Sequence, residues 1–487
     1  MSQTALAMAA LEPYIPSAQK PWNQQRVQHL YRRIGFGATQ AQTQAALAVS
    51  PDVLIEQLLN TAAGLPLPAL TVWSNYTQAD YDAQTDTNLK YRHREELFRR
   101  WTSEMVNEGI RAKMSFFWHN HFVTSLDVYD SNSYLWAYYS LLNEYAFGNF
   151  KTFATKMGKT GAMLVYLNGN SNVKTAPNEN YARELMELFT MGEGNGYTQN
   201  DVIQMAKALT GWRAKDYEGT PPYFDATKYD TGNKTIFGQT GAWNYDDAHN
   251  LIFTLRKDQV ANRICTKLYR FFVCDKVDTD VIAEMMTTFK ANNFEILPVL
   301  KQLFKSEHFF ESYFFNSHIK SAYETFIPLL KCAGLTYPTD ITDNLLGTIF
   351  YWTESIGQTM FYPPNVAGWI GHHNWLNENT ITYRWSYMNA ILYGVLTDAN
   401  KAKLRDLAIA LTNHSGDAVF VTQSVAEFFL NTTLRPEHLA VAVQYFKDGI
   451  PEHYFMEGSW SLDWDEAPKQ VTNLLSYLVR LPEYQVM

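Results

Sequence analysis

Apolar residues recur at intervals of three and four along most of the chain, which is the spacing of an amphipathic helix. This periodicity predicts helices over 89–118, 134–147, 259–273, 279–291, 296–306, 318–333 and 420–447. A further helix is predicted over 202–209. Thr198 and Asp201 precede it with the spacing of a capping box, and Gly211 follows it. Because few stretches alternate apolar and polar residues, the pattern predicts a mainly α fold.

Long segments rich in Gly, Pro and aromatic residues interrupt the helices at 62–76, 213–247 and 357–380. Structureless loops longer than about 15 residues are uncommon in compact domains and often functional. The segment 213–247 is therefore interpreted as either a long functional loop or a short hairpin. We predict an N-terminal extension over 1–20 and a large helical body over 21–395. A C-terminal helical subdomain over 396–487 is either separate from the body or continuous with it.

Composition excludes several classes of protein. The 487 residues carry a net charge of -9, whereas a general nucleic-acid binder should be basic, so we expect no nucleic-acid partner. Only three cysteines occur and none form a C-x-x-C pair, which argues against a disulfide framework or a cysteine zinc site. Charged residues are 18% of the chain and aromatic residues 15%, which indicates a globular protein.

Targeting signals give little information. No run of 18 apolar residues occurs, so no transmembrane segment is expected. The first residues lack a basic region before their apolar stretch, so no export signal is expected either. A cytoplasmic location is the default, and the true location is left open.

Two histidines lie in the aromatic segment 116–122. His119 and His121 have side chains that can bind a metal ion. On a helix, residues two apart point about 200° away from each other and cannot share one ion. At a helix end they can. The alternative is one buried histidine that is hydrogen-bonded to a carbonyl group and one polar histidine beside it.

A charged helix is predicted after Pro177, ending near Gly192. Helical spacing places Glu179, Arg183 and Glu187 on one face and Glu184 at the edge of the apolar stripe. One interpretation is a surface ladder of i,i+4 ion pairs, each worth about 0.2–0.5 kcal/mol. The other is a row of carboxylates that faces a cleft. Such carboxylates could bind a hard cation or act as acid and base.

The segment 363–375 contains two prolines, two glycines and two tryptophans, which is typical of a rigid aromatic loop. Trp369 and Trp375 offer flat faces for sugars or cations, and Asn365 offers a polar group beside them. Trp212, which follows Gly211, is a further candidate for substrate binding. The alternative is that these tryptophans only fill the core.

Other patterns are weaker or absent. His318, Lys320 and Glu324 fall near one helical face and are interpreted as a surface ladder. Gly158-Lys159-Thr160 resembles the end of a phosphate-binding loop, but Phe153 stands where that motif needs glycine. The common signatures of zinc proteases, α/β-hydrolases and dinucleotide enzymes do not occur.

Five motifs in order resemble the bacterial DUF1800 family, a domain family of unknown function. They occupy 26–37, 117–122, 178–185, 208–212 and 363–369, and the resemblance runs from about residue 21 to about 384. It implies no settled catalytic residues. Relatives often carry an export signal, and their genes often lie beside a DUF1501 partner, a family resembling sulfatases. Relatives often have His-Asp-x-Gly where this chain has Tyr229-Asp230-Thr231-Gly232.

Our leading hypothesis is an enzyme whose pocket combines histidine and glutamate side chains on a helical scaffold. The metal ligands would be His119, His121, Glu184 and Glu187, around a divalent metal ion. The catalytic candidates are Glu179, Arg183, Glu184 and Glu187, with the arginine orienting the carboxylates.

Two alternatives belong to other classes. In a metal-free glycan-active or glycan-binding protein, the same glutamates would supply acid and base. Trp212, Trp369 and Trp375 would then stack on sugar rings. In a non-enzymatic scaffold, the charged motifs would be buried ion networks, and the partner would be a DUF1501-type protein.

Overall fold

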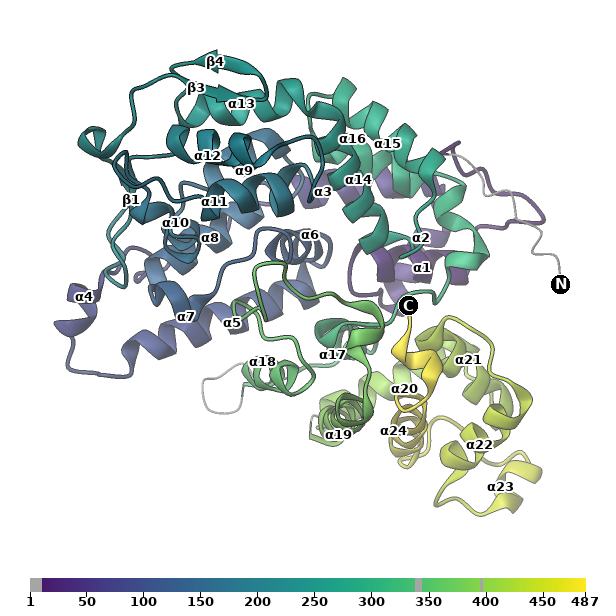
Figure 1. Ribbon diagram of the computed structural model, residues 1–487. Helices are drawn as coiled ribbons and strands as arrows, with labels where there is room; N and C mark the ends of the chain where they lie inside the picture. The colour runs from purple at the N-terminus through teal and green to yellow at the C-terminus, as the bar shows by residue number, and fades with distance from the viewer. Residues whose placement is uncertain (1–10, 338–343, 395–396) are drawn as a thin grey trace.

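The structure is a computed structural model that describes residues 11–337, 344–394 and 397–487. Within these ranges it contains 24 α-helices and only two small two-stranded sheets (Figure 1), which confirms the prediction of a mainly α fold. In the same ranges, no helix combines the length and the hydrophobicity needed to cross a bilayer.

The first half of the chain contains α1 (Gln24–Ile34), α2 (Gln40–Leu47), α3 (Pro51–Ala63), α4 (Gln78–Asp82), α5 (Leu89–Asn107), α6 (Ile110–His119), α7 (Leu126–Tyr129), α8 (Asn132–Glu144), α9 (Phe150–Met157), α10 (Gly161–Tyr166), α11 (Asn180–Glu184), the π-helix η2 (Leu185–Thr190) and α12 (Gln199–Ala208). The second half contains α13 (Tyr245–Leu255), α14 (Lys257–Phe272), α15 (Thr279–Ala291), α16 (Ile296–Lys305), α17 (Ala322–Cys332), α18 (Leu345–Ser355), α19 (Glu378–Gly394), α20 (Asp398–Thr412), α21 (Ala418–Leu430), α22 (Pro436–Lys447), α23 (Glu452–Met456) and α24 (Ala467–Leu478).

Most predicted helices are found close to their expected positions, and local chemistry explains the differences. The segment 89–118 is two helices, because Gly109 adopts φ +69°, which breaks the helical path between α5 and α6. The segment 420–447 is also two helices, because Asn431 ends α21 with φ +55° and Pro436 begins α22. The capping box of Thr198 and Asp201 is present at the start of α12. The Thr198 hydroxyl accepts a hydrogen bond from the backbone N–H of Asp201, and the Asp201 carboxylate accepts one from the backbone N–H of Thr198.

The segment 213–247 contains the hairpin that was one of its two interpretations. Strands β3 (Lys234–Ile236) and β4 (Gln239–Gly241) pair antiparallel. Phe237 and Gly238 connect them, both with positive φ, as the tight turns of hairpins require. Strands β1 (Trp212–Arg213) and β2 (Tyr223–Phe224) form the second small sheet.

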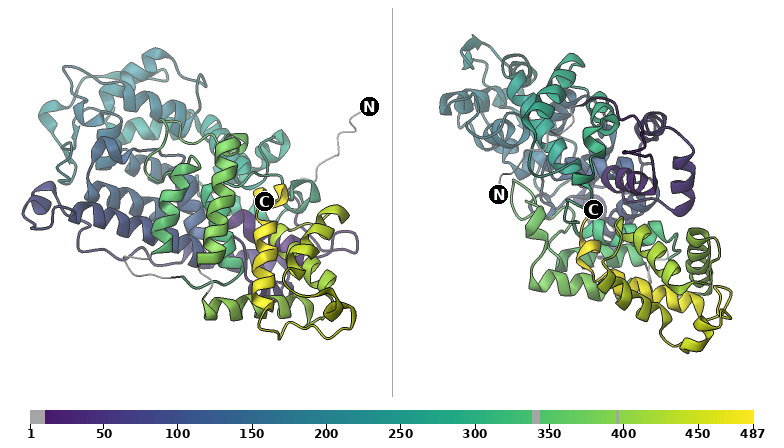
Figure 2. Two further views of the ribbon diagram at one scale, coloured as in Figure 1. Left: turned by 90° about the horizontal axis from the view of Figure 1, so that it is seen from below. Right: turned by 90° about the vertical axis from the view of Figure 1, so that its right-hand side faces the viewer.

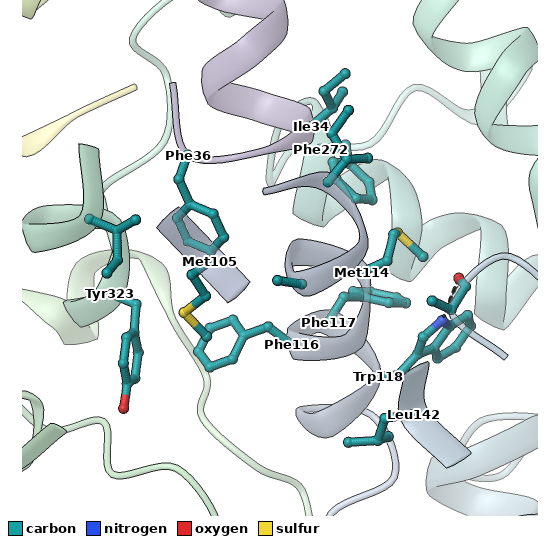
Figure 3. Close-up of a cluster of buried hydrophobic side chains, with 14 of the residues drawn as sticks. Ile34, Phe36, Met105, Met114, Phe116, Phe117, Trp118, Leu142, Phe272 and Tyr323 are labelled. Carbon is teal, nitrogen blue, oxygen red and sulfur yellow. Dashed lines mark hydrogen bonds between the residues drawn. The ribbon is translucent and has the colours of Figure 1, made fainter. Parts of the chain in front are cut away.

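Helix α6 is a central element of the core, because all ten of its residues are buried. Figure 3 shows Phe116 pointing from α6 toward Met105, whereas Phe117 and Trp118 point to the other side of the helix. Packing on both sides fixes the position of the helix end, where His119 and His121 lie.

Helices α20, α21, α22 and α24 pack on one another and form a lobe at the C-terminal end, seen in yellow tones in Figure 2. Buried arginines connect the lobe and the preceding segment to the body. Arg32 of α1 donates to the carbonyl of Phe428 at 2.8 Å, and Arg384 of α19 donates to the carbonyl of Lys320 at 2.8 Å. The predicted boundary between residues 395 and 396 lies outside the described residues and stays a prediction.

Candidate functional site

A pocket of about 710 Å³ lies where several segments distant in sequence meet. Its walls come from the C-terminal end of α6, from α14, from the segment 318–324 and from the loop 367–375. Figure 1 shows this loop, in green, running past α6 and α14. The volume lies within the range of roughly 300–1,000 Å³ that is typical of small-molecule sites.

Two of the sequence motifs hold each other at this pocket. The side chain of Asn120 donates to the carbonyl of Trp369 at 3.1 Å and accepts from the N–H of the same residue at 2.8 Å. Gly368, with φ +81°, makes this contact possible. A Cβ atom there would overlap Oδ1 of Asn120 and lie 3.0 Å from its carbonyl oxygen. Glycine is therefore required at this position for two reasons: the close packing against Asn120 and the positive φ angle.

His119 is fully buried and both of its ring nitrogens are used. Nε2 accepts from the N–H of Phe361 at 3.0 Å, so the proton is on Nδ1, which donates to the hydroxyl of Tyr138 at 2.8 Å. Burial lowers its pKa to about 3, so the ring is neutral. His119 therefore acts as a connector between α6, α8 and the segment before the loop.

His121, in contrast, lines the pocket. Its Nε2 donates to the carbonyl of Phe189 at 3.0 Å, which leaves Nδ1 as an acceptor. Nδ1 lies 3.1 Å from Nζ of Lys267 on α14. Burial, followed by the positive charges of Lys267 and Arg263, holds the pKa of His121 well below its usual value. The ring is thus neutral and fixed in one tautomer.

Three basic residues of α14 line the pocket: Arg263, Lys267 and Arg270. Their spacing places them within about 60° of one another on one helical face. Arg270 lies toward Asp275, 3.9 Å away, and Asp275 lies 3.3 Å from His372 of the loop. Arg263 and Lys267 have no carboxylate within salt-bridge distance among the described residues.

Two side-chain acceptors in the pocket walls, those of Glu324 and Gln358, are already engaged by the protein. The Glu324 carboxylate pairs with buried Lys113 and accepts from the N–H of Ser321 at 2.8 Å. The side-chain oxygen of Gln358 accepts from the N–H of Ala322 at 3.0 Å. Donors are in excess, because Nε of Arg263 is buried without a hydrogen-bond partner. Such a lining suits an acceptor-rich ligand.

The local field also affects Lys267 itself. Burial, followed by repulsion from Arg263, lowers the pKa of Lys267 to about 7. A carboxylate neighbour would have the opposite effect, but the hydrogen-bond partner here is the neutral ring of His121. A substantial fraction of this amine is therefore uncharged near neutral pH.

The predicted carboxylate helix is an ion-pair ladder. Arg183 contacts Glu179 at 2.9 Å and Glu187 at 3.5 Å. Glu184 is half-buried, and burial together with the charge of Glu187 raises its pKa. None of these four residues belongs to the pocket lining. The contacts are those of a ladder of i,i+4 ion pairs. The alternative, a row of carboxylates that faces a cleft, gains no support from this pocket.

The four predicted substrate-binding residues are divided between the pocket and other places. Trp369 and Trp375 line the pocket and are 7% and 8% exposed. Asn365 is exposed outside the pocket lining, where its side chain caps a turn by accepting from the N–H of Ala367 at 2.9 Å. Trp212 also lies outside the lining, where the ammonium of Lys159 lies 4.9 Å from its ring centre.

The residues predicted to bind a metal do not fit such a site as they are placed. Among the described residues, no group of three or more His, Cys, Asp or Glu side chains is arranged to hold a metal ion. His119 uses both ring nitrogens internally, and His121 directs one of its nitrogens to Phe189. The metal site stays a prediction from sequence.

The basic face of α14 was not predicted from the sequence, and part of the opposite wall was misjudged. Arg263, Lys267 and Arg270 have no acidic residue three or four positions away within the helix, and this signal was present in the sequence. His318, Lys320 and Glu324 were expected in a surface ladder. All three are buried, and His318 and Glu324 line the pocket. Glu324 is held there because it caps the start of α17 and pairs with Lys113.

The fold and this pocket define a mainly helical protein in which an aromatic loop and a central helix enclose a donor-rich cavity. The chain matches the family model described as "Protein of unknown function (DUF1800)" over residues 29–486. It therefore belongs to the DUF1800 family, and the resemblance seen in the five motifs is confirmed. The match also includes the C-terminal helices. No curated protein and no solved structure matches the chain.

Proposed function

We propose that the pocket binds a small anionic organic molecule and that the protein is an enzyme that acts on it. One observation carries this proposal: Arg263 and Lys267 lie on one face of α14, line the pocket and have no carboxylate partner among the described residues. Buried or half-buried cations normally pair with an anion. A bound carboxylate or phosphate would supply that anion and accept the free hydrogen bonds.

The remaining walls suggest what accompanies the anionic group. Trp369 and Trp375 lie in the loop wall, and Phe117 and Phe271 lie on α6 and near the end of α14. Aromatic side chains bind flat or apolar carbon skeletons well. We therefore propose a ligand with an anionic head at the basic face and a planar or apolar body against the aromatic residues.

Lys267 and His121 are the residues we propose for chemistry. An uncharged amine beside a neutral imidazole can accept a proton or attack an electron-poor carbon. This version of the enzyme hypothesis keeps His121 and the aromatic loop. It replaces the glutamates of 179–187 with Lys267 as the reactive group, because those glutamates lie outside the pocket lining.

A glycan ligand is a second candidate, favoured by the two tryptophans in the pocket wall. A sugar that carries a carboxylate or sulfate would satisfy both the aromatic and the basic residues. The interaction with a DUF1501-type protein stays a prediction from the family resemblance.

The test is calorimetric titration with three ligands of similar shape: benzoate, benzyl alcohol and benzylamine. We expect benzoate to bind most tightly. The single variants Arg263→Gln and Lys267→Met should weaken benzoate by roughly 10- to 150-fold, the value of a charge-assisted hydrogen bond of about 1.5–3 kcal/mol.

The matched control is Arg183→Met, which removes an equal charge from the ladder outside the pocket. It should change benzoate affinity less than about twofold at ordinary ionic strength, because screening weakens distant charges. If benzoate binds no better than benzyl alcohol, or if Arg183→Met weakens it as much as Lys267→Met, the anion site does not exist.

A further inference from the structure

We propose that Lys267 forms a covalent imine with the carbonyl carbon of an anionic aldehyde or ketone bound in the pocket. The inference rests on the proposed function, since it needs an anionic molecule in this site. It adds the substrate class, a carbonyl compound, and the bond that forms.

The contacts of Lys267 orient its amine for this reaction. Its only hydrogen bond among the described residues is to Nδ1 of His121, at 3.1 Å. Nδ1 must be the acceptor, because Nε2 donates its proton to the carbonyl of Phe189. Lys267 therefore donates one N–H to His121. In the uncharged amine, this leaves the nitrogen lone pair free for a ligand in the cavity that the residue lines.

The surroundings also favour the uncharged amine. A lysine that pairs with a carboxylate is held protonated, whereas a neutral imidazole exerts no such attraction. Arg263 lies one helical turn away on the same face of α14, so the neighbour of Lys267 on this face is another cation and not a carboxylate. A desolvated lysine beside another cation is a recognised form of activated nucleophile.

The same arrangement defines the position of the anionic group. Arg263 and Lys267 are four residues apart on α14, so their Cα atoms are separated by about 6 Å along the helix. A carboxylate or phosphate bound at Arg263 then brings a carbonyl carbon a few bonds away next to Nζ. Short oxo acids and phosphorylated aldehydes have this layout.

The step balances without a further reagent. The amine lone pair attacks the carbonyl carbon, a C–N bond forms, and the carbonyl π pair moves to oxygen. Proton transfer from nitrogen to that oxygen gives a carbinolamine. Loss of its hydroxyl with a second proton releases one water molecule and leaves the C=N bond. Once the imine nitrogen takes up a proton from solvent, it can draw electrons from the adjacent carbon of the substrate.

The test traps the imine on the full-length protein. The protein is incubated with pyridoxal 5′-phosphate, a flat aldehyde with a phosphate group, and then reduced with borohydride. Peptide mass spectrometry locates the label. At pH 7 we expect Lys267 to be labelled at least about tenfold more than Lys257, an exposed lysine of the same helix, because a phosphate bound at Arg263 holds the aldehyde beside Lys267.

Three controls test this result. Pyridoxal, which lacks the phosphate, should label Lys267 less than pyridoxal 5′-phosphate does. The variant Lys267→Arg should abolish the label at position 267, whereas Lys257→Arg should leave the label on Lys267 unchanged. Benzoate should protect Lys267 of the wild-type protein from labelling. Equal labelling of Lys257 and Lys267 overturns the imine. If benzoate binds as proposed but labelling is unselective, only the imine is wrong. If benzoate fails to bind as well, the proposed function is wrong.

Discussion

Two charged helical faces of this molecule have opposite roles. On α11 and η2, Arg183 lies between two glutamates at i,i-4 and i,i+4 and pairs with both. On α14, Arg263 and Lys267 have the same spacing but no acidic residue within helical reach, and they border a pocket. The first face neutralises itself, whereas the second leaves positive charge for a ligand. Charged residues on a helix therefore indicate a binding site mainly where the same helix offers no residues of opposite charge to pair with them.

The loop 367–375, which lines the pocket together with α14, provides the largest expected effect on stability. Gly368→Ala would place a methyl group against Asn120 at a residue with φ +81°. We expect a loss of about 2–3 kcal/mol in unfolding free energy, from the backbone angle and the displaced contact. Benzoate affinity should fall as well, although no charge is changed. Thermal unfolding and calorimetry measure both quantities.

A second glycine separates the cost of the backbone angle from the cost of the displaced contact. Gly238 has φ +80° in the turn between β3 and β4, but a Cβ atom added there would have no neighbouring atom within 4 Å. Gly238→Ala should cost only about 1 kcal/mol and leave benzoate binding unchanged. If Gly368→Ala behaves the same way, the wall does not shape the site, and the charges of α14 act alone.

The pH dependence of binding tests the unusual charge of Lys267. Because its pKa is lowered to about 7, the side chain is charged below that pH and loses its charge as pH rises through 7. Benzoate stays ionised, so its affinity should fall by up to about tenfold between pH 6 and 8.5. Lys267→Arg stays charged, so any slope that persists in this variant belongs to other groups. An equal slope in both proteins contradicts the assignment.

Sequence patterns predicted the helices better than the site. Periodicity and capping residues depend on neighbours in the chain, so α12 and α14 were predicted almost to their ends. The pocket depends on contacts between distant segments, such as Asn120 with Trp369. His119 and His121 show the limit most clearly. They share one motif, yet one is enclosed and the other borders the cavity, and only tertiary packing decides which.

Stability should respond to the two faces with opposite signs. An unpaired lysine in a partly dehydrated wall is unfavourable in the folded state, so Lys267→Met should raise the unfolding free energy by about 1 kcal/mol. Denaturant unfolding at pH 6, where the lysine is charged, measures this. A clear loss of stability would mean that Lys267 has a stabilising role in the fold, contrary to its assignment as a functional group.

The smallest expected effect on stability comes from the ion-pair ladder of Glu179, Arg183 and Glu187. Arg183→Met removes two i,i+4 contacts of a partly exposed side chain, which are worth about 0.3–0.5 kcal/mol each. We expect a loss of about 0.5–1 kcal/mol that shrinks in 1 M salt, because added ions screen surface pairs. The gain from Lys267→Met should depend less on salt, since it comes from removing a desolvated charge. A salt-independent loss in Arg183→Met would show that the arginine contributes through packing of its carbon chain and not through charge pairing.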